Sequence, residues 1–232
     1  MLLNVIALTV MLIQIFLIRG DFMLQTYTGT PGSGKSYHIV SDMINHIKIG
    51  GIVVTNLELD IKNILKYHPK ITQKDLDERL LILPNSSITP KLLFNISLQN
   101  INNQYARLLV IDEAGDLFNT REWNNANRPG WLKFFRMHRH LRYNCILVSQ
   151  HRKMLDKQIQ WLFDTDVQHR NIKEYGFLGW LLHLLFPKLF IAVSVYVPIN
   201  AKSGSTFVWL KKKYYECYDT YTLESISGGE FD

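Results

Sequence analysis

One short stretch limits the possible folds of this chain more than any other: Gly29-Thr30-Pro31-Gly32-Ser33-Gly34-Lys35-Ser36. It has the pattern of a phosphate-binding loop, in which a glycine and four free positions precede Gly-Lys-Ser. Residues 24–28 before it are expected to form a strand. Residues 37–47 after it have apolar side chains at the spacing of one helix face, at Ile39, Val40, Met43, Ile44 and Ile47. This strand–loop–helix unit predicts an α/β fold that binds the phosphates of a nucleotide.

The loop also predicts the roles of its residues. Successive backbone N–H groups and the positive end of the helix dipole should face the phosphates. Lys35 is expected to reach the β- and γ-phosphates and to take part in catalysis, and the Ser36 hydroxyl to hold Mg²⁺. The predicted cofactors are therefore ATP and Mg²⁺. The predicted nucleotide-binding residues are Gly29, Thr30, Pro31, Gly32, Ser33, Gly34, Lys35, Ser36 and Tyr37.

Two acidic residues follow another expected buried strand, residues 108–111. Residues 108–111 are all apolar, and Asp112 and Glu113 come directly after them, at the end of a parallel strand where ligands bind. Asp112 is the predicted second ligand of Mg²⁺, and Glu113 the predicted general base for an attacking water. A glutamate in this place favours the branch of phosphate-loop ATPases with a carboxylate base. No guanine-specifying Asn-Lys-x-Asp motif is present.

Further strands complete the predicted sheet. Strands should begin near Leu24, Ile52, Leu108 and Cys145, with another near Val167, and helical segments separate most of them. That alternation predicts a P-loop NTPase fold, a parallel sheet flanked by helices. Gln150 follows the strand 145–148, where it could orient the attacking water or sense the γ-phosphate.

The remaining pattern predicts shorter elements around this core. Helices are expected at 57–67, 72–80, 91–104, 131–143 and 154–163, with a brief strand at 81–83. The apolar region 177–197 has two interpretations. In one, a short helix at 178–186, lying in a membrane interface or against the domain, precedes a C-terminal β-hairpin of strands 190–197 and 206–215. In the other, the region is a membrane span interrupted by Pro187 and Lys188.

The N-terminal residues also have two interpretations. Leu2–Ile18 contains no charged residue, and Arg19 follows it. It is either an uncleaved membrane anchor with the rest of the chain in the cytoplasm, or a segment before a true start at Met23. The predicted organisation is 1–22 as the apolar segment, 23–175 as the ATPase core, 176–224 as an extension of the same domain, and 225–232 as a tail. The two cysteines, Cys145 and Cys217, suggest no disulfide framework, so a reducing compartment is expected.

The net charge of +6 leaves the partner open. It suits nucleic acid or an anionic membrane surface, and equally a lysine-rich composition without a basic patch. The most basic stretch lies in the expected helix 131–143, which is either a solvated helix face or a contact with a polyanion or with a neighbouring subunit's nucleotide. Basic residues interleaved in it include Arg136, His138, Arg139, His140 and Arg142.

Taken together, these motifs resemble the zonula occludens toxin family, which includes the morphogenesis ATPase of filamentous phages. The resemblance covers residues 23 to about 223. Its motifs are Thr28–Tyr37, Val54-Thr55-Asn56, Leu109–Ala114, His138-Arg139-His140, Ile146–Gln150 and Tyr218-Asp219-Thr220-Tyr221.

The resemblance implies a membrane-associated ATPase that drives assembly and extrusion of a filamentous virion through the host membrane. The implied partners are phage coat proteins or the DNA–protein filament, the host cytoplasmic membrane, and further copies in a homo-oligomeric ring. Family members usually carry a membrane segment after the ATPase domain, whereas the clearest apolar span here is N-terminal.

Two other functions remain open, a DNA translocase or packaging ATPase and a nucleotide-binding membrane scaffold without turnover. In a ring, an arginine of one subunit would complete the next subunit's site. The candidates are Arg139, Arg142, Arg152 and Arg170.

Overall fold

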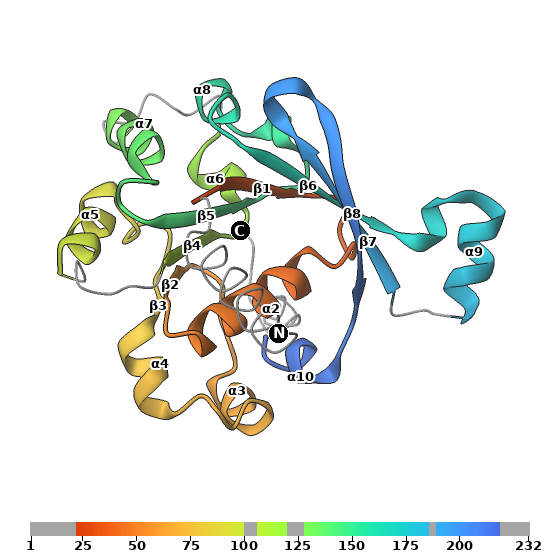
Figure 1. The fold of residues 1–232 in the computed structure, drawn as a ribbon, viewed down its shortest axis with the longest axis horizontal. Helices are drawn as coiled ribbons and strands as arrows, with labels where there is room; N and C mark the ends of the chain where they lie inside the picture. The colour runs from red at the N-terminus through yellow and green to blue at the C-terminus, as the bar shows by residue number, and fades with distance from the viewer. Residues whose placement is uncertain (1–21, 100–105, 120–127, 186–188, 219–232) are drawn as a thin grey trace, which may run out of the picture.

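The computed structural model describes residues 22–99, 106–119, 128–185 and 189–218. They form one eight-stranded sheet, in the order β3-β2-β4-β5-β1-β6-β7-β8, with helices on both faces (Figure 1). The first six strands in this order are parallel, and β7 and β8 join β6 as an antiparallel hairpin. The strands are β1 (Leu24–Thr28), β2 (Ile52–Thr55), β3 (Leu80–Ile82), β4 (Arg107–Ile111), β5 (Tyr143–Val148), β6 (Thr165–Asn171), β7 (Leu189–Tyr196) and β8 (Ala201–Trp209).

The helices bury the two faces of the sheet separately. One apolar core lies under α2 (Lys35–Lys48), α3 (Ile61–Tyr67), α4 (Gln73–Arg79) and α10 (Lys212–Tyr215). The other lies under α5 (Pro90–Gln99), α6 (Ala114–Leu117), α7 (Arg128–Met137) and α8 (Lys157–Gln160). Both faces of β2 and β4 are buried, which agrees with their apolar residues at 52–54 and 108–111. Helix α9 (Gly176–Leu185) projects from the body beside the short helix η2 (Ile172–Glu174) (Figure 1).

Aromatic side chains pack α7 against the sheet and against Phe118. Trp131 stacks on Phe135 with the ring centroids 5.5 Å apart, and its edge meets Phe118 at 5.1 Å. Phe134 packs edge-on against Tyr143 at the start of β5. All five side chains are buried, so Trp131, Phe134 and Phe135 of α7 are part of the core.

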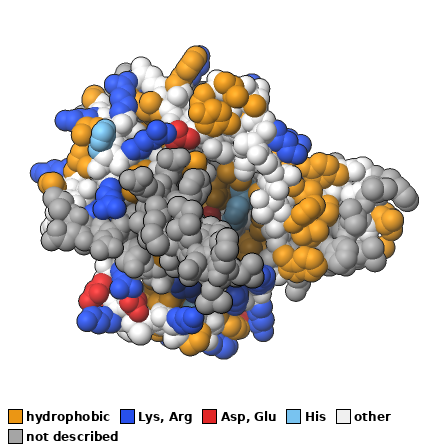
Figure 2. Space-filling view, in the orientation of Figure 1, with side chains coloured by type: hydrophobic (Ala, Val, Ile, Leu, Met, Phe, Trp, Pro, Cys, Tyr) orange, Lys and Arg blue, Asp and Glu red, His pale blue; other side chains and the backbone are white. Residues whose placement is uncertain are grey.

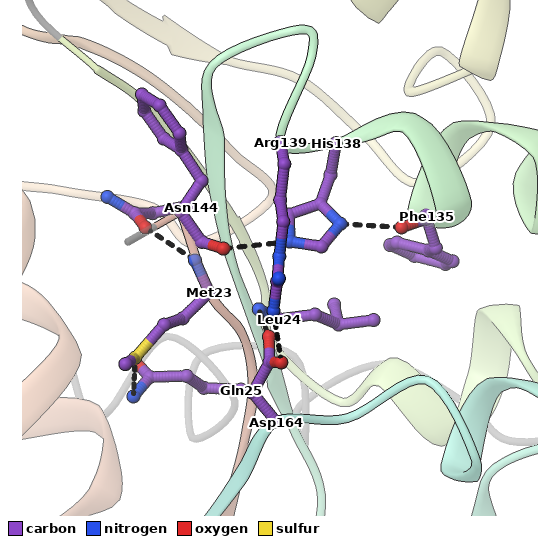
Figure 3. Close-up of polar contacts among 9 residues, drawn as sticks. Met23, Leu24, Gln25, Phe135, His138, Arg139, Asn144 and Asp164 are labelled. Atoms are coloured by element: carbon purple, nitrogen blue, oxygen red, sulfur yellow. Dashed lines mark hydrogen bonds and ion pairs between the residues drawn. The ribbon is translucent and has the colours of Figure 1, made fainter. Parts of the chain in front are cut away.

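Polar contacts hold the start of β1 between β5 and β6 (Figure 3). The Met23 N–H donates to Asn144 Oδ1 and the Leu24 N–H donates to Asp164 Oδ2, each at 2.9 Å. Arg139 donates to the other oxygen of Asp164 at 2.5 Å. The ring nitrogens of His138 lie within hydrogen-bond distance of the Phe135 and Phe22 carbonyl oxygens. His138 is therefore buried, and it does not belong to a solvated helix face.

The structure confirms the parallel sheet flanked by helices and the C-terminal hairpin, and it corrects several boundaries. The helix expected at 131–143 ends at Met137, because the chain turns before β5 and Arg142 adopts a positive φ of 57°. The helix expected at 154–163 is divided, since Asp156 caps a separate helix by accepting from the Gln158 N–H.

The second hairpin strand differs most from the sequence pattern. It is β8, residues 201–209, instead of 206–215, and residues 212–215 form α10. The pattern failed because Ser203-Gly204-Ser205, within the strand, has the composition of a turn.

Some predictions lie outside the described residues. These are the apolar segment 1–22 except for Phe22, the end of the helix 91–104, the interruption at Pro187 and Lys188, and residues 219–232, which include the end of the extension 176–224 and the tail 225–232. Within the described ranges, no helix has both the length and the apolar composition needed to cross a bilayer.

Tyr37 links α2 to the hairpin, which gives a stability prediction. Its buried hydroxyl donates to the Trp209 carbonyl at 2.8 Å and accepts from the Lys211 N–H at 3.0 Å. Tyr37→Phe leaves both backbone groups without this partner, so we expect it to destabilise the protein by about 1–3 kcal/mol. Urea denaturation should show a lower midpoint with an unchanged slope. The exposed Tyr175 provides the control Tyr175→Phe, expected within ~0.5 kcal/mol of wild type. Equal midpoints for the two variants would contradict the role of Tyr37.

Candidate active site

Three loops meet at the carboxyl ends of β1, β5 and β4. Since β5 lies between the other two strands, it brings the phosphate loop and the acidic pair to opposite sides of Gln150. A cavity of about 310 Å³ opens there. Its lining residues are Pro31, Gly32, Lys35, Ser36, Asp112, Glu113, Gly115, Asp116, Val148, Ser149, Gln150 and Met154. The structure therefore gathers every predicted catalytic and metal-binding residue around one space.

The backbone of the phosphate loop is fixed on both sides. The Gly29 N–H donates to the Gln150 carbonyl at 3.2 Å, which ties the loop to the end of β5. On the β6 side, a Cβ at Gly29 would lie 2.3 Å from the His169 carbonyl oxygen, and φ of Gly29 is +146°. Gly32 and Gly34 also have positive φ, 72° and 89°. No side chain fits at Gly29, so the glycine is required by contact as well as by conformation.

Lys35 lies across the loop at the start of α2. Its ammonium donates to the Gly29 carbonyl at 2.7 Å and to the Thr30 carbonyl at 3.0 Å. Burial lowers the pKa of Lys35, and the nearby carboxylates of Asp112 and Glu113 act in the opposite direction. The lysine thus places a cation against the backbone of the loop, beside the cavity, which suits a phosphate.

The acidic pair is held by a residue whose role sequence reasoning did not assign. Asn56, just after β2, accepts from the Asp112 N–H at 2.7 Å and donates to the Asp112 carbonyl at 2.8 Å. Its amide also donates to Asn85 at 2.8 Å. Glu113 has a left-handed backbone, with φ 48° and ψ 45°, and its N–H donates to Asp112 Oδ1 at 3.0 Å. A non-glycine residue in this conformation is uncommon and is frequent at functional sites.

The donor set fits a magnesium ion. Ser36 supplies a hydroxyl and Asp112 a carboxylate to the same cavity. Burial raises the pKa of Asp112, and the N–H of Glu113 is the largest opposing influence. A cation at this carboxylate would favour its ionised form. Mg²⁺ prefers oxygen ligands and takes few of them from the protein, so a hydroxyl and a carboxylate are sufficient.

Tyr37 differs from the other predicted nucleotide-binding residues. Its hydroxyl is bonded to Trp209 and Lys211, on the side of the hairpin. Its backbone N–H lies in the first turn of α2, where helical N–H groups have no partner in the same helix. Any contribution of Tyr37 to phosphate binding therefore comes from the backbone.

The four candidate arginines lie at two ends of the sheet. Arg152 and Arg170 line a second cavity, of about 440 Å³, together with Gly29 and Thr30 of the loop. Arg139 precedes the turn into β5, at the amino end of the sheet, where it pairs with Asp164. Arg142 lies in the same turn. Two of the candidates are thus next to the phosphate loop and two are at the opposite end of β1.

Next to the phosphate loop, His38 of α2 and His169 of β6 form a pair that the sequence did not predict. His38 Nδ1 and His169 Nε2 are 2.8 Å apart, and Nδ1 of His169 faces the Thr28 and Val167 carbonyls. The Tyr27 hydroxyl donates to Asp42 at 2.8 Å. Burial is the main cause that lowers the pKa of His169 to about 3, with the charge of His38 acting in the same direction. His169 is therefore neutral, and it holds β6 against the loop.

Comparison with known proteins gives a family. Residues 23–181 match the zonular occludens toxin (Zot) family. The Gene 1 protein of Enterobacteria phage f1 is 28% identical over 204 residues, which cover 83% of this chain and 58% of that protein. The chain thus spans little more than half the length of this curated relative.

Solved structures share the fold. The N-terminal domain of zonular occludens toxin from Neisseria meningitidis superposes with a TM-score of 0.52 and 21% identity, over 86% of this chain and all of that domain. The genome packaging NTPase B204 from Sulfolobus turreted icosahedral virus 2, in complex with ATP-gammaS, gives 0.51 and 16% identity, over 81% and 97%.

Lys35 gives a direct test of the site. Lys35→Ala removes the cation that lies across the loop, and we expect affinity for ATP to fall about tenfold or more, since a hydrogen bond to a charged group contributes roughly 1.5–3 kcal/mol. Titration of a fluorescent ATP analogue measures this. Lys74, which is 82% exposed on α4, provides the control Lys74→Ala with unchanged affinity. Full affinity in Lys35→Ala would place the nucleotide elsewhere.

The buried His169 predicts a dependence of stability on pH. Its pKa is about 3 when folded and 6.5 in the reference state, so below pH 6.5 the unfolded chain takes up a proton that the folded chain excludes. The stability that neutral His169 confers is complete above pH 6.5. It is lost as the pH falls toward 3, by up to about 1.4 kcal/mol per pH unit.

His169→Gln should therefore flatten the decline in the free energy of unfolding across this range, measured by urea denaturation at a series of pH values. The exposed His151 is the matched control, and His151→Gln should follow wild type. If the free energy of unfolding of His169→Gln declined with pH as steeply as that of wild type, protonation of His169 would not be what destabilises the folded protein.

Proposed function

Because the chain belongs to the zonular occludens toxin family, we propose that it is a membrane-associated ATPase that powers assembly and extrusion of a filamentous phage virion. The observation that carries this proposal is the cavity that collects a lysine, a hydroxyl and a carboxylate pair on one phosphate-loop fold, from Lys35, Ser36, Asp112 and Glu113. A glutamate at the end of the strand supplies a general base, which hydrolysis needs and nucleotide binding alone does not.

Each residue has a defined task in hydrolysis. The N–H groups of the loop and the ammonium of Lys35 bind the phosphates and compensate their negative charge. Glu113 accepts the proton of the attacking water, and Gln150, exposed at the tip of β5, orients that water. Ser36 and Asp112 would hold Mg²⁺, which would supply further compensation of negative charge. Asn56 acts through the backbone of Asp112 as a positioning residue.

The site is completed by a second copy. Among the described residues that line the cavity, Lys35 carries a positive charge, whereas Asp112, Glu113 and Asp116 carry negative charges. We propose a homo-oligomeric ring in which an arginine of the adjacent subunit adds positive charge at the γ-phosphate. Arg139, Arg142, Arg152 and Arg170 remain the candidates.

The partners follow from the family. The f1 relative is a phage Gene 1 protein, which supports a phage component as the moved substrate, either coat protein or the DNA–protein filament. We place the protein at the host cytoplasmic membrane, anchored by Leu2–Ile18, with the ATPase domain of residues 23–175 in the cytoplasm and residues 176–224 as its extension.

A second candidate function is a DNA translocase or packaging ATPase. A shallow cavity of about 540 Å³ on α7 is lined by Arg128, Lys133 and Arg136, a charge pattern that suits nucleic acid phosphates. Hydrolysis stimulated by DNA, with a strong dependence on salt, would favour this function. Hydrolysis indifferent to DNA favours the assembly motor.

Glu113 separates a motor from a scaffold without turnover. Glu113→Gln removes the general base but keeps the size of the side chain, so we expect ATP to bind with near wild-type affinity and hydrolysis to fall about 100-fold or more. Phosphate release and binding of the fluorescent analogue measure the two effects. The exposed Glu78 on α4 provides the control Glu78→Gln, with wild-type turnover. Unchanged turnover in Glu113→Gln would leave the scaffold as the better explanation.

A further inference from the structure

The end of the sheet opposite the phosphate loop is a distinct surface formed by four segments. Asp164, just before β6, donates its N–H to the Leu24 carbonyl at 2.8 Å and accepts from the Val197 N–H at 3.0 Å. The same aspartate pairs with Arg139 (Figure 3). The start of β1, the approach to β6, the end of β7 and the turn before β5 therefore lie side by side at this amino edge.

Large apolar and aromatic side chains are exposed at these segments. Trp161 is 86% exposed, Ile199 72%, Tyr196 44% and Met23 37%. Figure 2 shows hydrophobic side chains gathered at the top of the view, over α8 and the β7–β8 turn, with cations over α7 beside them. Arg139 is 60% exposed, and His140 next to it is exposed too. We call this set the amino-edge patch: Met23, Arg139, His140, Trp161, Tyr196 and Ile199.

The composition of this patch is that of a membrane interface. Tryptophan and tyrosine are enriched where a bilayer meets water, since their rings are apolar and carry one polar group. Cations beside such rings are attracted to lipid phosphates. A tryptophan that is 86% exposed is otherwise unusual, because its large ring contributes most when it is removed from water.

The covalent chain supplies a second, independent constraint. Leu2–Ile18 is uncharged, and residues 19–22 alone separate it from Met23. Five Cα–Cα steps span at most about 17 Å. If residues 2–18 lie in a bilayer, Met23 and the segments bonded to it must lie within that distance of the lipid.

We propose that the amino-edge patch lies in the phospholipid headgroup layer, with Trp161 and Ile199 toward the acyl boundary and Arg139 facing lipid phosphates. In this orientation Arg139 does not reach an adjacent subunit's nucleotide, which leaves Arg142, Arg152 and Arg170 as the candidates for that role. This proposal rests on the membrane anchor given in the proposed function. The contact of the patch with lipid would define the orientation of the domain relative to the membrane. Strand β1 runs away from the lipid for five residues, about 17 Å, before the phosphate loop, so the nucleotide cavity faces the cytoplasm.

Site-directed labelling of the full chain tests this orientation. Cys145 and Cys217 are buried, so a thiol-reactive dye will mark an exposed cysteine introduced by Trp161→Cys or Ile199→Cys. The matched control is Phe207→Cys, which is 69% exposed on β8 and six positions beyond Ala201, about 20 Å from the patch. None of these residues contributes to the cavity, so ATP turnover should remain at the wild-type level in all three labelled proteins.

The labelled proteins are reconstituted into vesicles of phosphatidylcholine and phosphatidylglycerol that contain a headgroup nitroxide. We expect strong quenching of the dye at positions 161 and 199 and several-fold weaker quenching at 207. Equal quenching at the three positions, in protein that floats with the vesicles, would overturn this orientation while leaving the anchor intact. Protein that does not float would overturn both. A dye at 161 or 199 that is shielded from an aqueous quencher, yet unaffected by the nitroxide, would mean that a second copy covers the patch, which also overturns the proposal.

Discussion

The approach of Gly29 to the His169 carbonyl sets the position of the phosphate loop. No Cβ can be placed there, and the N–H of the same glycine is bonded to the end of β5. The loop is thereby clamped between the strands on either side of β1. The position of Lys35 and the direction of α2 follow from this clamp, since both come directly after the loop. His38, on the first turns of α2, meets His169 from the other side. A larger residue at position 29 would disturb all of these contacts together.

How far the sequence predicts this protein depends on the range of the interactions involved. The phosphate loop, the strands at Leu24, Ile52, Leu108 and Cys145, and the position of Asp112 are encoded locally, in glycine spacing and buried apolar runs, and the structure confirms them as elements. The positioning role of Asn56 depends on β2 lying beside β4, which is a contact across 56 positions. Nothing in the local pattern near Asn56 contains that information.

The errors have the same origin. Residues 138–142 look helical because their polar side chains suit a solvated face, yet His138 is buried against backbone carbonyls from two segments. The strand β8 was expected too late in the chain, because its first residues, 201–205, include few that favour strands. Its pairing with β7, including the register shift at Ser194 and Val195, compensates for this composition. Tertiary pairing overrode local preference in both cases.

The hairpin of β7 and β8 runs from the phosphate loop to the amino-edge patch. At one end, the ring of Phe190 lies 3.2 Å from where a Cβ of Gly34 would be, and the Trp209 carbonyl accepts from Tyr37 on α2. At the other end of β7, six residues or about 20 Å from Phe190, is Tyr196, and Ile199 follows in the turn to β8. Strand β7 is also bonded to β6 along Thr165–Asn171, so the hairpin and the rest of the sheet form one continuous body. A displacement of the phosphate loop would therefore reach Tyr196 and Ile199 only through the sheet, together with β6.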